Sequence, residues 1–157
     1  MPIHWWENPK LELRQNSTGQ ALPVRIYDSR EADVANPTGA LTAGSTREIF
    51  VANFTVNTWA AVGAAFSVTV MDTVGQGYLT VYPSDLASPP AVSTINWSTS
   101  GVVVSTGLVT RLGAAPDPDE PAWLSTVKVA CLGGEPPTST HFTIDMTACW
   151  LLSTLNV

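Results

Sequence analysis

The sequence is poor in positive charge. Its 157 residues contain seven Lys and Arg against thirteen Asp and Glu, which gives a net charge of −6. A chain that binds nucleic acid needs a cluster of cations to contact the phosphates, and the seven basic residues here are scattered. An anionic membrane surface would repel the chain for the same reason. We therefore expect neither nucleic acid nor a membrane among its partners.

Long apolar runs are missing as well. The longest apolar stretches, such as residues 60–66, are far too short to span a bilayer. The opening residues, MPIHWWENPKLELRQ, lack the basic segment, apolar segment and small-residue cleavage site of a secretory signal. We expect a protein that is synthesised in a cytoplasm without a signal peptide.

The motifs of enzymes and metal sites are not found. The two histidines, His4 and His141, lie at opposite ends of the chain, and no serine stands in a Gly-x-Ser-x-Gly motif. We expect no cofactor, no metal and no enzymatic activity. Asp28 and Asp145 interrupt apolar segments, and we interpret them as structural carboxylates, Asp28 being two residues from Arg30. A carboxylate pair across a cleft, as in a small glycan hydrolase, stays open as an alternative.

What the sequence does contain is the composition of strands and turns. It is 45% hydrophobic and only 13% charged, and short segments of alternating polarity recur between Gly and Pro breakers. In the clearest, Phe66, Val68 and Val70 share one face and hydroxyl side chains the other. We predict an all-β, two-sheet antiparallel β-sandwich with nine strands: 24–27, 48–54, 66–72, 78–82, 94–97, 102–104, 108–112, 125–131 and 141–151.

The chain divides into a short N-terminal arm, residues 1–22, and a sandwich domain, residues 23–157. Residues 75–77, Gly-Gln-Gly, are predicted to form a hairpin turn. Strict alternation along residues 141–151 predicts that Cys149 points outward while Cys131 fills the core, so we expect no disulfide.

Six tryptophans are many for this length. Trp97 and Trp150 lie in strand patterns and are predicted to be core residues. His4, Trp5 and Trp6 lie on the unpatterned arm, where the aromatic pair either covers an edge of the sandwich or docks on a neighbouring subunit. Trp59 and Trp123 border loops, which makes them the candidate surface-binding aromatics.

Three segments resemble a known family. The central one is Gly77-Tyr-Leu-Thr-Val-Tyr-Pro83, followed by Val92-Ser-Thr-Ile-Asn-Trp97. It is flanked by Val24-Arg-Ile-Tyr-Asp-Ser-Arg30 and His141-Phe-Thr-Ile-Asp-Met-Thr147. Together they resemble, over about residues 23–152, a β-domain of actinobacterial secreted proteins and actinobacteriophage virion proteins.

The resemblance implies a non-enzymatic structural protein on the exterior of a tailed-phage virion, either decorating the capsid or attached to the tail. The expected partners are the chain itself, as a homotrimer, and the major capsid or tail protein, with the arm as the docking segment. The alternative is a carbohydrate-binding module for a glycan of the actinobacterial host surface, with Trp59 or Trp123 stacking on sugar rings.

Overall fold

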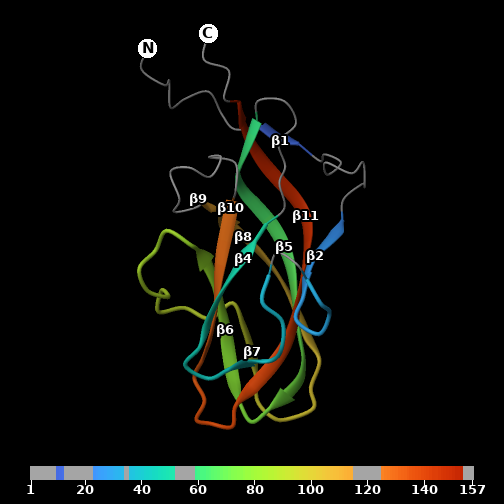
Figure 1. The fold of residues 1–157 in the computed structure, drawn as a ribbon, viewed down its shortest axis with the longest axis vertical. Coiled ribbons are helices and arrows are strands. Elements are labelled where there is room, and N and C mark those ends of the chain that lie inside the picture. Colours follow the sequence, from blue (N-terminus) through green and yellow to red (C-terminus); the bar gives the residue numbers. More distant parts are fainter. Residues whose placement is uncertain (1–9, 13–22, 34–35, 52–58, 115–124, 154–157) are drawn as a thin grey trace.

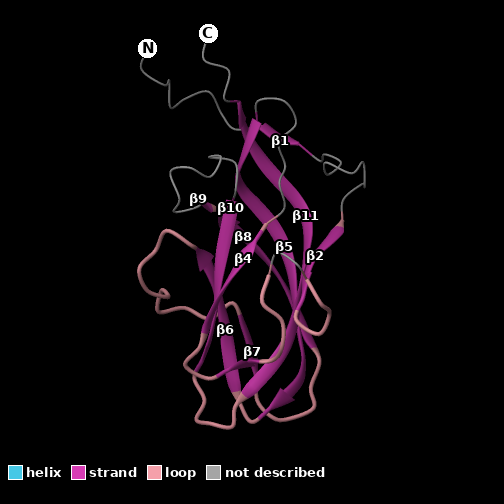
Figure 2. Cartoon of the chain, viewed as in Figure 1, coloured by secondary structure: helices cyan, strands magenta, loops and turns pink. Residues whose placement is uncertain are grey.

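The computed structural model describes residues 10–12, 23–33, 36–51, 59–114 and 125–153. This part of the chain consists of strands and loops (Figure 2). Its eleven strands form two antiparallel sheets, which confirms the predicted all-β sandwich. Among the described residues, no helix is long and apolar enough to cross a membrane.

The six-stranded sheet is built around its two longest strands. β5 (Trp59–Val74) and β11 (Ser139–Ser153) run side by side along the long axis of the molecule (Figure 1). β8 (Val104–Arg111) pairs with the other side of β5. The far side of β11 pairs with three short strands: β1 (Lys10–Glu12), β2 (Val24–Asp28) and β3 (Leu41–Thr42).

The five-stranded sheet is centred on β10 (Ser125–Leu132) and β6 (Gly77–Pro83). The remaining strands are β4 (Thr46–Phe50) and β9 (Gly113–Ala114), which pair with β10, and β7 (Ile95–Trp97), which pairs with β6. β6 is buried at five of its seven positions, as expected of a strand in the middle of a sheet.

The core lies between the two sheets. Phe66, Val68 and Val70 are buried there, while Ser67 and Thr69 are half-buried on the opposite face of β5, as the alternation predicts. Trp97 is also buried, as predicted, whereas Trp150 is only half-buried. The largest fully buried side chains are Tyr27, Phe66, Phe142, Leu41, Ile49, Leu79, Ile144 and Met146.

Two local predictions were wrong. Residues 102–104 and 108–112 do not form separate strands, because β8 continues through Gly107, which pairs with Ser67 of β5. The turn at residues 75–76 is not a hairpin, since it joins β5 of one sheet to β6 of the other. Gly75 has a φ of 69° there, a conformation that L side chains rarely adopt.

The orientation predicted for Cys149 was also wrong. β11 pairs Met146 with Phe66 and then Ala148 with Ala65, so Thr147 is bulged out of the register. One extra residue reverses the alternation beyond it. Cys149 therefore points into the core, where it is as fully buried as Cys131. The two thiols form no disulfide.

Part of the predicted arm belongs to the sheet. β1 pairs with residues 149–151 near the end of β11, with Leu11 opposite Trp150. The three arm residues of special interest, His4, Trp5 and Trp6, lie outside the described residues.

We expect both thiols to resist modification by a thiol reagent such as DTNB in the native protein and to react at once in denaturant. Burial raises the pKa of Cys131 to about 11, so little thiolate is present at neutral pH. Peptide mapping after timed labelling assigns the reaction to each cysteine. Rapid native labelling of either one would contradict the position described for it.

Candidate functional site

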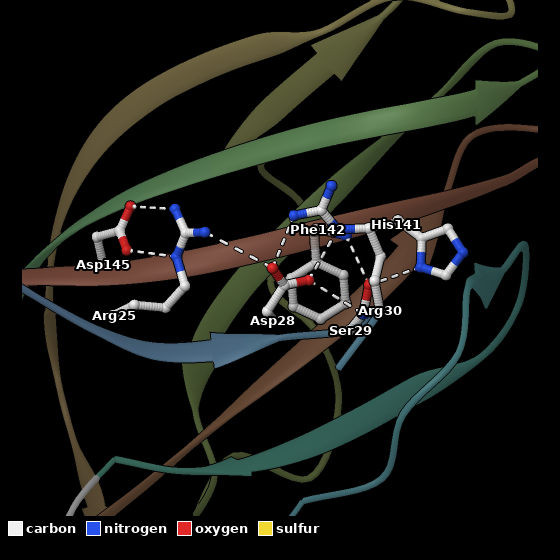
Figure 3. A network of polar contacts seen from close by, with 7 residues as sticks. All are labelled: Arg25, Asp28, Ser29, Arg30, His141, Phe142 and Asp145. Carbon is white, nitrogen blue, oxygen red and sulfur yellow. Dashed lines mark hydrogen bonds and ion pairs between the residues drawn. The ribbon is translucent and has the colours of Figure 1, made fainter. Parts of the chain in front are cut away.

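A cluster of polar side chains lies where β2 meets β11. The ladder places Arg25 opposite Asp145 and Asp28 opposite Thr143, with a register shift between Ile144 and Asp145. Chain segments that are more than a hundred residues apart thus meet through their backbones. Their charged side chains lie together on this sheet, as Figure 3 shows.

Asp28 is the centre of the cluster. Its side chain is only 3% exposed. It accepts two hydrogen bonds from the Arg30 guanidinium, Nε at 2.9 Å and Nη2 at 2.7 Å, and a third from the Arg30 backbone N at 3.0 Å. A buried carboxylate is costly unless its oxygens are paired, and a two-pronged contact with arginine is the strongest pairing available.

A second arginine extends the cluster. Arg25 Nη1 lies 3.6 Å from an oxygen of Asp28, and its Nε and Nη2 donate to Asp145 at 2.8 and 3.2 Å. The four side chains form an alternating row, Asp145, Arg25, Asp28 and Arg30, drawn in Figure 3. We call this row the ion-pair row. Both arginine side chains and Asp145 reach solvent, so only the Asp28 carboxylate is desolvated.

The row stabilises the charged form of Asp28. Hydrogen bonds from Arg30 hold the pKa of Asp28 at about 2, although burial alone would raise it. Hydrogen bonding to Asp145 raises the pKa of Arg25 in turn. A carboxyl group with such a low pKa is a poor general acid or base at neutral pH.

Beside the row lies a serine and histidine pair. Ser29 Oγ is 2.9 Å from His141 Nδ1, the arrangement of a nucleophile and its base (Figure 3). The same oxygen accepts a hydrogen bond from the backbone N of Phe142 at 3.0 Å, and Ser29 is fully buried. A nucleophile without exposure has no access to substrate, so this pair ties the end of β2 to β11.

The loop that follows β2 is held by further ties. Tyr27 Oη donates to the carbonyl of Pro37 at 2.6 Å and accepts from Arg47 Nη1 at 2.7 Å. Arg47 lies on β4 of the other sheet and also donates to the carbonyl of Gly39 at 2.7 Å. Burial raises the pKa of Tyr27, which keeps the phenol protonated as a donor. The loop therefore links the two sheets.

A shallow hollow opens beside the ion-pair row. It is lined by Arg25, Ile26, Tyr27, Asp28, Glu31, Ala32 and Asp33. Among the described residues, no three His, Cys, Asp or Glu side chains gather as metal ligands do. The hollow carries charges of both signs, and the carboxylate of Asp28 in its wall is already paired.

The structure brings two of the predicted site residues together and leaves the others undescribed. Asp28 and Asp145 are joined through Arg25. Trp123 lies outside the described residues, and Trp59 opens β5 without a described side chain. Sequence reasoning missed the pairing of Ser29 with His141. The one signal for it was that both residues stand in segments flanking the central motif.

Comparison with protein-family models, with curated proteins and with solved structures found no match to this chain.

We expect Asp28→Asn to lower the free energy of unfolding by about 1–2 kcal/mol at pH 7, discounted for the exposed arginines. Because the native pKa is depressed, this contribution is complete above the unfolded pKa near 4 and disappears as the pH falls through about 2. Urea unfolding of wild type and of Asp28→Asn, at a series of pH values from 7 down to about 2, measures this difference in the free energy of unfolding.

Asp85→Asn is the matched control. Asp85 forms the same two-pronged contact with Arg111, at 2.8 and 2.9 Å, but both side chains are about half exposed. Exposed pairs contribute little, so the control should unfold close to wild type. Equal losses in the two variants would show that burial does not distinguish Asp28.

Proposed function

We propose that this chain is a non-enzymatic structural protein of a tailed-bacteriophage virion with an actinobacterial host, located on the exterior of the capsid or tail. The proposal rests on one observation: the polar residues of the segments that resemble the family make structural contacts within the domain. Arg25, Asp28, Ser29, Arg30 and His141 bind one another or the backbone. These contacts hold the loop after β2 against the six-stranded sheet.

The central motif supports the same proposal. Residues 77–83 form β6, a mostly buried strand in the middle of its sheet, and Trp97 at the end of β7 packs in the core. Motif residues with such positions specify a fold. A sandwich with an acidic sequence suits a protein displayed on a particle surface.

Docking on the particle is proposed to occur through the arm, by burial of Trp5 and Trp6 beside His4. Apolar burial contributes about 25 cal/mol per Å², so two tryptophans are substantial anchors before the entropic cost of association. Repetition of the contact over a symmetric lattice multiplies its effect. The major capsid or tail protein is the partner in this proposal.

Quantitative mass spectrometry of purified virions tests the assignment. We expect this chain in the particle at a fixed ratio to the major capsid protein. Hundreds of copies per virion indicate a capsid decoration, and a few to tens indicate a tail or vertex component. Absence from the particle would overturn the proposal and turn attention to the glycan-binding alternative, tested by quenching of tryptophan fluorescence with host glycans.

Deletion of residues 1–9 should abolish rebinding of the purified protein to particles that lack it. The deletion leaves β1 and the described sandwich intact, so the thermal unfolding midpoint should stay near that of the full chain. Cosedimentation with particles measures binding. Undiminished binding of the deleted chain would exclude the arm as the docking segment.

A further inference from the structure

The strand edges of the sandwich differ in how well they are protected from pairing with another chain. At a sheet edge, one row of backbone N–H and C=O groups lacks a strand partner, and proteins shorten, charge or cover such edges to prevent pairing with other chains. The far side of β11 is covered by β1, β2 and β3 in succession.

Both edges of the five-stranded sheet are protected. β4 is five residues long, carries Arg47 and Glu48, and has the backbone N of Phe50 capped by Asn36 Oδ1 at 2.8 Å. β7 is three residues long, and beyond it Thr94 Oγ1 accepts from the backbone N of Val81 at 2.9 Å.

β8 is less protected in the described part of the chain: only the hydroxyls of Thr106 and Thr110 donate to edge carbonyls, those of Gly107 and Arg111, at 3.5 and 3.1 Å. It is eight residues long, contains neither Pro nor Lys, and pairs on one side only, with β5. Val109 is 68% exposed on its outward face, and Val103, just before it begins, is 70% exposed. Its one charge, Arg111, is neutralised by Asp85 of the same chain. This is an edge suited to receiving a strand.

We propose that β8 pairs antiparallel with β8 of a second copy of this chain, about a two-fold axis at Leu108, so that the two six-stranded sheets become continuous. The strand is self-complementary in that register. Gly107 lies opposite Val109 of the second copy, so the exposed valine covers a position without a side chain. Ser105 lies opposite Arg111 of the second copy, and no two like charges face each other.

The pairing fits a two-fold interface, in which the same residues serve on both sides. It predicts an even-numbered assembly, whereas the homotrimer expected from the sequence is three-fold. It concerns the isolated protein in solution, so it stands separately from the virion assignment. A monomeric protein abundant in virions would overturn the pairing alone, and a dimer absent from virions would overturn the assignment alone.

Light scattering after size exclusion, over a range of concentrations, tests the pairing. Wild type should have twice the mass of one chain. Val109→Lys places a charge on the edge and should weaken dimerisation by at least ~10-fold. Val92→Lys is the matched control, because Val92 is similarly exposed, at 63%, but lies in the segment between β6 and β7 and not on β8, and it should dimerise as wild type does. A monomeric or trimeric wild type, or an unaffected Val109→Lys, would overturn the proposal.

Disulfide trapping fixes the register and does not depend on a destabilising variant. Gly107→Cys combined with Val109→Cys should give a covalent dimer on mild oxidation, since opposed strand residues lie within disulfide reach. Gly107 tolerates a side chain, because its nearest neighbour to an added Cβ is the Phe66 carbonyl at 3.9 Å. Gly107→Cys alone should stay unlinked, and a covalent dimer from it would place the axis at Gly107 instead.

Discussion

The pairing of β11 with β5 is the constraint on which the rest of the six-stranded sheet depends. The ladder runs from Ser139 opposite Val74 to Ser153 opposite Trp59, the length of the molecule. β1, β2 and β3 have no other strand partners among the described residues, and each attaches to the opposite side of β11. A strand flanked on both sides must fix its register well, because a slip of one residue would turn its buried face outward.

The ladder accommodates three register shifts and still buries an apolar face. Before the bulge at Thr147, the even-numbered residues of β11 from Phe142 to Met146 face the core. After it, the odd-numbered Cys149 does. Where β2 meets this strand, polar side chains replace apolar packing. Asp28 is tolerated there because Arg30 donates hydrogen bonds to its oxygens and Arg25 lies within ion-pair distance, and both arginines keep their contact with water.

Local patterns predicted most of the longer strands, but neither the short strands β1, β3 and β9 nor the connections between strands. The alternation at Phe66, Val68 and Val70 predicted β5 because burial of one face is written into every second residue. The same reasoning failed at Gly107, which looked like a breaker but is held in β8 by pairing with Ser67. It also failed at Gly75, where a tight turn connects β5 to β6 of the other sheet. Which sheet each strand joins is determined by pairing with strands distant in the sequence. The bulge at Thr147 could not be predicted, because the residues before it alternate regularly.

The candidate site shows the same division. A carboxylate two residues from an arginine, Asp28 and Arg30, is visible as a local pair in the sequence. The contact of Ser29 with His141 spans 112 positions and follows only from the β2–β11 register. A single sequence contains no direct record of such a pairing. Long-range contacts of this kind set the sheet order as well.

The order in which the strands are made follows from the place of β11. It is synthesised after β1, β2, β3, β5 and β8, and it is the central partner of the first four. Until residues 139–153 have left the ribosome, β5 can pair only with β8, while β1, β2 and β3 have no strand partner, and the Asp28 carboxylate lacks the β11 backbone beside it. The complete six-stranded sheet therefore cannot form before β11 has been synthesised. Its folding is closure by the last strand, at the high loop-closure cost that slows β-rich chains.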